Sequence, residues 1–222
     1  MHIKLIREII SRIASGIYED GKRLPAERKL CDQFSVSRGT IRQALADLEK
    51  LGVITVKPGS GAYVRKYSYK NIPGHILPPE FSNVTLKDII TARKAIEMAA
   101  IDTACEKISE TQLSELEKKL QIMSEHMDNL PEFLRIDMDF HQAVVRSSGN
   151  VVLATAFEAI SEYHKYSQVF TSIHAGEEQK AHNYHRKILD ALRARDKKKA
   201  KKTLENHLDY MKKMVSDSNI NL

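Results

Sequence analysis

Four side chains of the kinds that bind metal ions fall on the apolar faces of three predicted helices in the second half of the chain. They are Asp137 and His141 in the helix predicted over 131–148, His185 in 177–195 and His207 in 197–216. A single histidine on such a face is more often a hydrogen-bonded core residue, but burying four polar groups together is costly unless something pairs with them. A divalent cation pairs with all four, and one ion is within reach of both Asp137 and His141 because they lie four residues apart on a helix. Three histidines and one aspartate suit zinc, nickel, iron or manganese, and the ligand set does not choose among these metals. We expect one ion per chain, with zinc as the first candidate.

A second set of polar residues indicates an anion pocket near these four. Arg93 lies on the inner face of its predicted helix. Its guanidinium can form an ion pair with Glu97 one turn later, or it can bind a carboxylate through two parallel hydrogen bonds. The helix predicted over 150–173 becomes polar toward its C-terminal half, where His164 and Ser167 take core-facing positions. That change is typical either of a pocket wall or of a partly exposed helix end, and both interpretations stay open.

The N-terminal third of the chain predicts three helices followed by a β-hairpin. Apolar residues at three- and four-residue steps mark a first helix over 6–17, Pro25 marks the first turn of a second helix over 26–34, Ser37 caps a third helix, and 53–56 and 62–64 flank a Pro-Gly-Ser-Gly turn. This order is the winged helix-turn-helix arrangement, whose third helix enters the major groove of DNA. Arg38 and Arg42 share one face of that helix, and an arginine fork can bind guanine O6 and N7.

The rest of the chain divides into a linker and a helical region. Residues 66–84 contain three of the six prolines and lack periodicity, so they are predicted to be a linker. Helical periodicity then continues almost to the C-terminus, with breaks that define helices over 85–107, 110–128, 131–148, 150–173, 177–195 and 197–216. The expected fold is therefore mainly α. A winged helix-turn-helix covers 1–65, and an all-α antiparallel bundle of about six helices covers 85–216.

Composition and charge narrow the classes of protein. The chain has 222 residues, of which 42% are hydrophobic, so it can form a core without disulfides. No apolar run approaches the ~18 residues of a membrane helix, and the first residues lack the core of a signal peptide. Cys31 and Cys105 lie far apart without CxxC spacing, which favours a reducing cytoplasm over a disulfide scaffold. Of the net charge of +6, residues 1–65 hold +5, as expected of a nucleic-acid-binding module on a nearly neutral body.

Short motifs in the N-terminal third are more specific than its charge. They are Leu24-Pro25-Ala26-Glu27-Arg28, Val36-Ser37-Arg38, Thr40-Ile41-Arg42, Ala44-Leu45, Leu48, Leu51-Gly52 and Gly59-x-Gly61. With these motifs, residues 5–65 closely resemble the DNA-binding domain of the GntR family of bacterial transcription regulators. The resemblance implies DNA contacts by Arg28, Arg38 and Arg42, support at the DNA backbone from Ser37 and Thr40, and a wing tip at Gly59. Gly39 departs from the pattern, because many relatives carry a larger residue at that position.

A looser set of motifs follows in the helical region. It comprises Asp137-x-x-Phe140-His141, Ser148-Gly149-Asn150, His185-x-x-Ile188-Leu189-x-Ala191 and His207-Leu208. With these motifs, residues 85–215 resemble the FadR-type C-terminal effector domain, known as FCD. In metal-binding members of that group an Asp-x3-His pair and two later histidines hold the ion, and all four positions are present here. The resemblance also associates the arginine at position 93 with an organic-acid effector.

Together these features predict a cytoplasmic DNA-binding transcription regulator whose operator affinity is controlled by a small carboxylate bound at the metal site. The expected partners are a palindromic double-stranded operator, the organic acid and a second copy of the chain, and no membrane. The first alternative is a metal-dependent enzyme, in which an open metal position activates water, but no residue beside the ligand stripes could serve as a general base. The second alternative is a DNA-binding regulator whose metal is purely structural.

Overall fold

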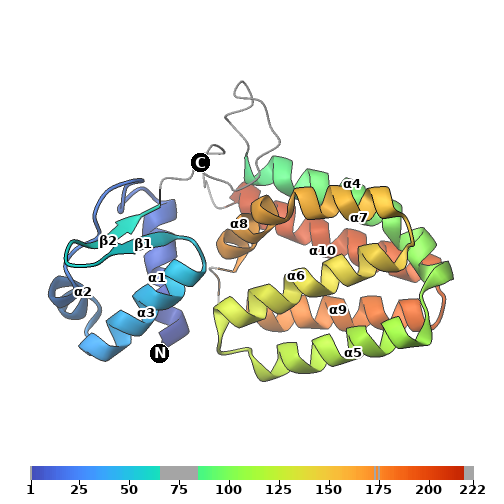
Figure 1. Cartoon of the computed structure of the whole chain (residues 1–222), viewed down its shortest axis with the longest axis horizontal. Helices are drawn as coiled ribbons and strands as arrows, with labels where there is room; N and C mark the ends of the chain where they lie inside the picture. Colours follow the sequence, from blue (N-terminus) through green and yellow to red (C-terminus); the bar gives the residue numbers. More distant parts are fainter. Residues whose placement is uncertain (1, 66–84, 173, 175, 218–222) are drawn as a thin grey trace.

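The computed structural model of this chain describes residues 2–65, 85–172, 174 and 176–217 (Figure 1). They form a head, made of three helices and a hairpin, and a bundle of helices beside it. The predicted fold class, mainly helical with a winged helix-turn-helix ahead of a helical bundle, is confirmed. The linker predicted over 66–84 lies outside the described residues.

The head follows the predicted order of elements. It comprises α1 (His2–Ala14), α2 (Glu27–Phe34), α3 (Arg38–Lys50), β1 (Ile54–Lys57) and β2 (Gly61–Val64). The two strands are antiparallel, with Ile54 opposite Val64. Ile9 of α1 and Ile41 of α3 are fully buried, so the apolar stripes of these helices form the core of the head as predicted.

Two predicted helix ends differ from the structure. The first helix ends at Ala14, and Ile17 is 63% exposed because the chain turns away at Gly16, whose φ is +76°. Only glycine adopts such a backbone conformation without strain. Pro25 lies ahead of α2 instead of in its first turn, because the helix begins at Glu27. The predicted cap on α3 is confirmed, since the Ser37 hydroxyl accepts a hydrogen bond from the amide of Thr40 at 3.2 Å.

The bundle contains α4 to α10 within the described residues. Their bounds are α4 Leu86–Lys107, α5 Glu110–Glu125, α6 Leu130–Ser147, α7 Val151–Ala159, α8 Ser161–Thr171, α9 Glu177–Arg193 and α10 Lys197–Asp217. The single helix predicted over 150–173 is thus two helices, separated at Ile160, whose φ and ψ are −95° and 5°. One non-helical residue between two periodic segments hardly disturbs the apolar spacing, so periodicity does not reveal the break.

Local side-chain caps explain where several of these helices start. Thr85 and Asp88 form a reciprocal capping box at the start of α4, and Ser109 and Gln112 do the same for α5. The Asn150 side chain accepts hydrogen bonds from the first amides of α7. These caps satisfy amides that have no partner inside the helix.

Helix α4 occupies the centre of the bundle and carries charge there. It packs against α6, α7, α8, α9 and α10 (Figure 1). Most of its inner residues are apolar, but Arg93 and Glu97 are only 3% and 1% exposed. A buried charge must be paired, so these two residues mark the region in which the bundle carries its polar chemistry.

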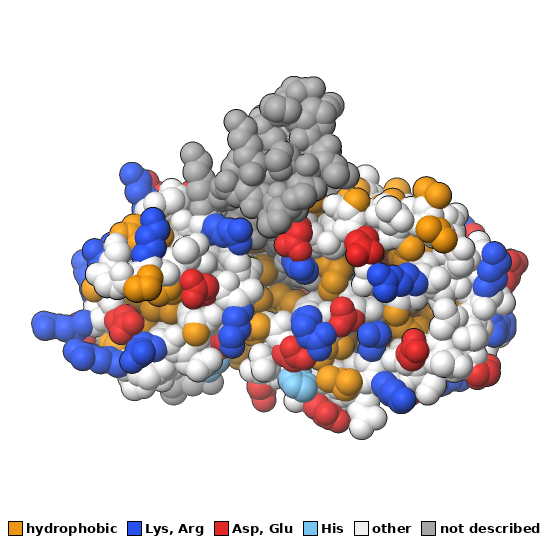
Figure 2. Space-filling model, in the orientation of Figure 1, with side chains coloured by type: hydrophobic (Ala, Val, Ile, Leu, Met, Phe, Trp, Pro, Cys, Tyr) orange, Lys and Arg blue, Asp and Glu red, His pale blue; other side chains and the backbone are white. Residues whose placement is uncertain are grey.

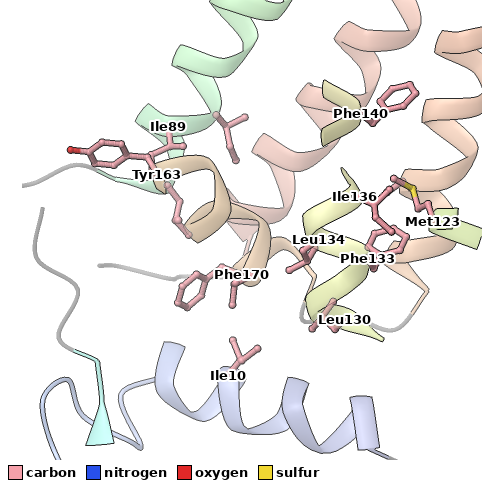
Figure 3. Packing of buried hydrophobic residues seen from close by; sticks show 14 of the residues in the cluster. Ile10, Ile89, Met123, Leu130, Phe133, Leu134, Ile136, Phe140, Tyr163 and Phe170 are labelled. Carbon is pink, nitrogen blue, oxygen red and sulfur yellow. The ribbon is translucent and has the colours of Figure 1, made fainter. Parts of the chain in front are cut away.

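The head and the bundle share one apolar core. Helix α1 packs against α8, and residues of both belong to the same cluster of buried side chains. In Figure 3, Ile10 of α1 faces Phe170, which lies near the end of α8. Within the described residues, no helix combines the length and the apolar character needed to cross a membrane.

Candidate functional site

Three buried histidines from three helices meet inside the bundle. His141 of α6, His185 of α9 and His207 of α10 are at most 1% exposed, and one nitrogen from each lies within 4.8 Å of the others. The Nε2 atoms of His141 and His185 are 3.0 Å apart. The ring of His207 is stacked on that of His141, with centroids 5.4 Å apart. The structure therefore brings together the three histidines that the sequence singled out.

Asp137 lies beside this group. Its Oδ1 atom is 3.3 Å from His185 Nε2, and its Oδ2 atom is 4.0 Å from His141 Nε2. The same Oδ2 accepts a hydrogen bond from the side chain of Gln168 on α8. Asp137 thus lies next to His141 and His185, and the hydrogen bond from Gln168 orients its carboxylate.

The spacing of these residues agrees with a single ion. Ligand atoms held at about 2.0–2.2 Å from one metal are roughly 3–4 Å apart. The contacts among Asp137, His141 and His185 are 3.0, 3.3 and 4.0 Å, and the nitrogens of the three histidines, His207 included, lie within 4.8 Å of one another. At 3.0 Å the two Nε2 atoms share one hydrogen bond when one of the rings carries a proton there, whereas a cation between them attracts both lone pairs. The chemistry of the donors and their spacing therefore agree with a divalent metal site.

A buried carboxylate sets the orientation of His141. The Nδ1–H of His141 donates to Glu97 Oε2 at 2.6 Å, which leaves the Nε2 lone pair facing the other histidines. Glu97 also accepts a hydrogen bond from Arg93 Nε at 2.9 Å. Outer carboxylates of this kind fix the tautomer of a metal-binding histidine and strengthen it as a ligand.

Burial and neighbouring charges shift the pKa values in this cluster in opposite directions. Burial lowers the pKa of His185 and His207 well below the ordinary value, and the electrostatic interactions with His141 and with the Arg93 guanidinium add to the effect. Burial raises the pKa of the Asp137 carboxyl, against the pull of His141 and Arg93. Burial alone would raise the pKa of Glu97 too, but the electrostatic interactions with His141 and Arg93, and the hydrogen bonds from both, lower it to about 2. The two inner histidines are therefore held neutral, the form that binds metal.

Arg93 forms the predicted ion pair with Glu97 and still has one N–H donor for an anion. The ion pair with Glu97 is present, but it uses Nε. The Nη2 atom is buried and has no hydrogen-bond partner among the described residues. A buried guanidinium N–H without a partner is costly, so this donor is available to an anion.

The two predicted pocket residues of α8 are both buried, in different circumstances. His164 is fully buried between His141 and Phe157, and neither ring nitrogen has a partner among the described residues. Burial lowers its pKa well below the ordinary value, with the charge of Arg93 adding to the effect. The Ser167 hydroxyl donates to the His164 carbonyl in its own helix, so the helix already provides its partner.

A small cavity adjoins the cluster. About 30 Å³ of it is open to the centre of a water molecule. Its lining includes Arg93, Asp137 and His207 on one side, and Thr171, Ser172, Glu177 and Glu178 on the other, where α8 ends and α9 begins. The second group was not singled out from the sequence, nor was Gln168, although Gln168 and Thr171 continue the helical spacing from His164.

The head presents an exposed basic surface. Arg28 of α2 and Arg38 and Arg42 of α3 are exposed, and no ion pair or hydrogen bond of their side chains is found among the described residues. Lys and Arg side chains line the outer edge of the head in Figure 2. Cations without a protein partner remain free to contact phosphates and base edges.

The other predicted DNA contacts lie at the start of α3 and in the turn of the hairpin. The Ser37 and Thr40 hydroxyls are 2.9 Å apart at the N-terminus of α3, a position that favours phosphate. Gly59 stands in the turn of the hairpin with a φ of +70°, and a Cβ there would meet no atom within 4 Å. The wing tip is thus a bare backbone that another molecule can approach closely.

Comparison with known families agrees with this division. Residues 4–64 match the family described as bacterial regulatory proteins, gntR family, and residues 88–210 match the FCD domain. The chain is 32% identical to the HTH-type transcriptional regulator YcbG of Bacillus subtilis, over 96% of this chain and 88% of that protein. It is 29% identical to the HTH-type transcriptional repressor NanR of Escherichia coli K12, over 91% of this chain and 79% of NanR.

Two solved structures share the fold of this chain. A GntR protein of Streptococcus agalactiae superposes with a TM-score of 0.52 at 21% identity, over 96% of this chain and all of that one. McbR/YncC of Escherichia coli gives a TM-score of 0.52 at 18% identity, over 97% of each chain. At these identities the likeness concerns the fold.

Proposed function

Because the chain belongs to the GntR family of bacterial transcription regulators and carries an FCD domain, we propose that a small carboxylate bound at a metal site in the bundle controls its affinity for operator DNA. The chain is a DNA-binding regulator and not an enzyme. We assign the DNA-binding domain to residues 1–65, the linker to 66–84 and the effector domain to 85–216. Repression is the mode we propose, because the NanR relatives are described as repressors.

On the DNA side, the helix α3 enters the major groove. Arg38 and Arg42 contact bases or phosphates there, and Arg28 contacts the flanking backbone. Ser37 and Thr40 bind a phosphate at the start of α3, and Gly59 carries the wing to the minor groove. The support for these roles is exposure together with the lack of any described protein partner for the three arginines.

On the effector side, Asp137, His141, His185 and His207 hold one divalent ion, zinc being the first candidate. When bound, the ion supplies a positive charge that attracts a carboxylate. Glu97 keeps the His141 Nε2 lone pair turned toward it, and Gln168 does the same for the Asp137 carboxylate. The low pKa values of His185 and His207 keep both rings able to bind metal under mildly acidic conditions.

The observation that carries the effector proposal is the set of buried polar atoms without a described partner around this cluster. Arg93 Nη2 and both nitrogens of His164 belong to that set. Folded proteins satisfy nearly all such groups, so the exceptions indicate a missing binding partner. A small organic acid satisfies the Arg93 donor with one carboxylate and a second polar group at His164. Ser167 remains a predicted contact of the sequence, with no observation in its favour.

Regulators with one reading head per chain recognise palindromes as dimers. We therefore propose a homodimer on a palindromic operator. The effector then shifts the spacing of the two heads, and it can do so only by its difference in affinity for the two arrangements.

The test is operator binding measured with zinc and a panel of acetate, succinate and citrate. An effective acid should change operator affinity by roughly 5–150-fold. Arg93→Ala should keep zinc and basal DNA binding and lose that response. The control Arg146→Ala removes an exposed arginine paired with Glu158 and should respond as the wild type does. A wild-type response in Arg93→Ala would contradict the effector role, and zinc binding without any response to acids would favour a structural metal.

A further inference from the structure

One carboxylate beside the cavity is held in place with an oxygen that has no described donor. Glu177, the first residue of α9, lines the cavity and is only 5% exposed. Its Oε1 atom accepts hydrogen bonds from Lys180 Nζ and from the Tyr210 hydroxyl, each at 2.9 Å. Its Oε2 atom is buried and has no hydrogen-bond partner among the described residues. Because two donors fix the carboxylate through one oxygen, the other oxygen is a positioned acceptor for a ligand.

Two hydroxyls on the same side of the cavity also offer only acceptors. The Thr171 hydroxyl donates to the Gln168 carbonyl at 3.2 Å, and the Ser172 hydroxyl donates to the Val169 carbonyl at 2.9 Å. Thr171 and Ser172 both line the cavity. A hydroxyl has a single hydrogen, so each of these side chains has only lone pairs left for a ligand.

Gln168 adds a further acceptor to the lining of the cavity. Its Nε2 atom donates to the carboxylate of Asp137, and its Oε1 atom is buried without a partner in the described part of the chain. A carboxylate accepts hydrogen bonds, so the NH₂ group of the amide must face Asp137. The oxygen of the amide is therefore the group that a ligand can reach.

The other side of the cavity attracts anions. Arg93 Nη2, a buried donor without a described partner, lies there with Asp137 and His207, two of the proposed metal ligands. The two sides of the cavity thus make opposite demands on a ligand, a carboxylate on one side and hydrogen-bond donors on the other. A second carboxylate would bring no donor, and it would meet the like charge of Glu177.

We propose that the effector is a carboxylic acid that carries a hydrogen-bond donor, either a hydroxyl or an ammonium group, at its far end, and that Glu177 selects for this donor. The donor binds Glu177 Oε2, with the lone pairs of Thr171 and Ser172 as neighbouring acceptors. An acid without a donor leaves the buried carboxylate oxygen unpaired, and that penalty is what makes such a site selective. This proposal rests on the proposed function, because it takes the cavity to be the effector site.

The test uses the full-length, zinc-loaded protein and a matched series of acids. Propanoate, butanoate and pentanoate are each used unsubstituted and with a terminal hydroxyl, a terminal ammonium or a terminal carboxylate. Calorimetric titration gives the Kd of each acid. At the chain length that binds best, the hydroxyl or the ammonium form should bind at least about tenfold tighter than the unsubstituted acid, and the dicarboxylate should bind no tighter than the unsubstituted acid. The two forms with donors distinguish a neutral donor from a charged one.

Glu177→Gln reverses the polarity of the selecting group with little change of shape. The amide oxygen can accept the hydrogen bonds from Lys180 and Tyr210, which places an NH₂ group where Oε2 lies. The variant should therefore lose the tenfold preference and bind the dicarboxylate more tightly than the wild type does. Glu162→Gln is the matched control, because it removes the same charge from a carboxylate that is 42% exposed and pairs with Lys165. It should keep the wild-type preference.

The outcomes separate this inference from the proposed function. Equal affinity for unsubstituted and donor-bearing acids at every chain length would overturn the inference and leave the proposed function standing. A preference for the donor that persists undiminished in Glu177→Gln would overturn the role of Glu177. Zinc binding without binding of any acid in the series would contradict the proposed function itself. Zinc titration of Glu177→Gln checks that a lost preference is not a loss of folding.

Discussion

Arg38 and Arg42 lie exposed on α3 without a described protein partner, whereas Arg93 is buried in α4 and bonded to Glu97. The first two arginines cost the fold almost nothing, because water solvates them until DNA arrives. The third is held in the interior by a carboxylate and still has one donor without a partner. The head and the bundle thus carry their functional cations under opposite conditions of solvation.

This difference shows what kind of evidence each region offers. On the head, function is visible as charge without a protein partner, and it agrees with the motifs in the sequence. In the bundle, function is visible as buried polar atoms that have no hydrogen-bond partner among the described residues. These atoms belong to Arg93, His164, His185 and His207. Removing a buried charge of the bundle should therefore change stability and ligand binding together, whereas removing an exposed arginine of the head should change DNA affinity without changing stability.

The largest effect is expected from Glu97→Gln. The change removes the carboxylate that neutralises Arg93 and orients His141, and removing one partner of a buried pair costs about 3–5 kcal/mol of unfolding free energy. Urea denaturation of the variant and of the wild type measures this difference in unfolding free energy. The matched control is Glu117→Gln, at a half-exposed carboxylate that pairs with Arg186 and Arg193 and should cost at most about 1 kcal/mol. Equal costs for the two variants would contradict the contrast between buried and exposed charge.

Acid should destabilise the metal-free protein through its buried histidines. His164, His185 and His207 have depressed pKa values when folded, so below about pH 6.5 the unfolded chain binds protons that the folded chain refuses. Stability is therefore complete above that pH and falls as the pH drops, by up to about 1.4 kcal/mol per histidine and pH unit. Denaturation in the presence of a chelator, at several pH values between 7.5 and 5.5, gives the slope of unfolding free energy against pH. His164→Phe should reduce that slope by the equivalent of about one bound proton. A flat profile would mean that these rings are protonated in the fold.

Loss of a ligand should abolish metal binding. His207→Ala should weaken zinc binding at least ~100-fold, which removes about 2.7 kcal/mol of the stabilisation that zinc provides. Calorimetric titration and the melting temperature of the bundle measure the two quantities. His182→Ala is the control, because that ring bonds to the Leu120 carbonyl outside the cluster. Full zinc occupancy in His207→Ala would show that His207 is not a zinc ligand.

Operator affinity should depend on the two arginines of the recognition helix. Arg38→Ala and Arg42→Ala should each cost about 1–3 kcal/mol of DNA binding and leave the unfolding free energy unchanged. Arg193→Ala lowers the net charge equally from the far domain and should have little effect. Affinity should also fall steeply with salt as counterions are released. Wild-type affinity in both α3 variants would exclude the assigned recognition surface.

The smallest effect distinguishes two glycines of the head. A Cβ on Gly39 would meet only the Ser37 Oγ, at 3.7 Å, so Gly39→Ala should stabilise α3 by about 0.5–1 kcal/mol. Gly59→Ala should destabilise by about 1–2 kcal/mol despite open space, because its φ is +70°. Thermal unfolding of the two variants should therefore shift in opposite directions, and shifts of the same sign would contradict the argument from backbone conformation.

The sequence by itself determined the features that depend on near neighbours along the chain. Helical periods, the cap at Ser37 and the hairpin turn at Gly59 act over three or four residues, and the structure has them where they were expected. The placement of Asp137 and the three histidines on inner helix faces was also predictable, because each face is set by its own helix. The i, i+4 pair of Arg93 and Glu97 was visible for the same reason.

Only the tertiary structure decided which atoms meet. The break at Ile160, the hydrogen bond of His141 Nδ1 to Glu97 and the contact of Gln168 with Asp137 all depend on how α4, α6 and α8 pack. Arg7 meets Ser172 across 165 residues of chain. No periodic pattern encodes such a contact, because its energy arises from burial and from complementary charge in the packed state, and these exist only once the helices have come together.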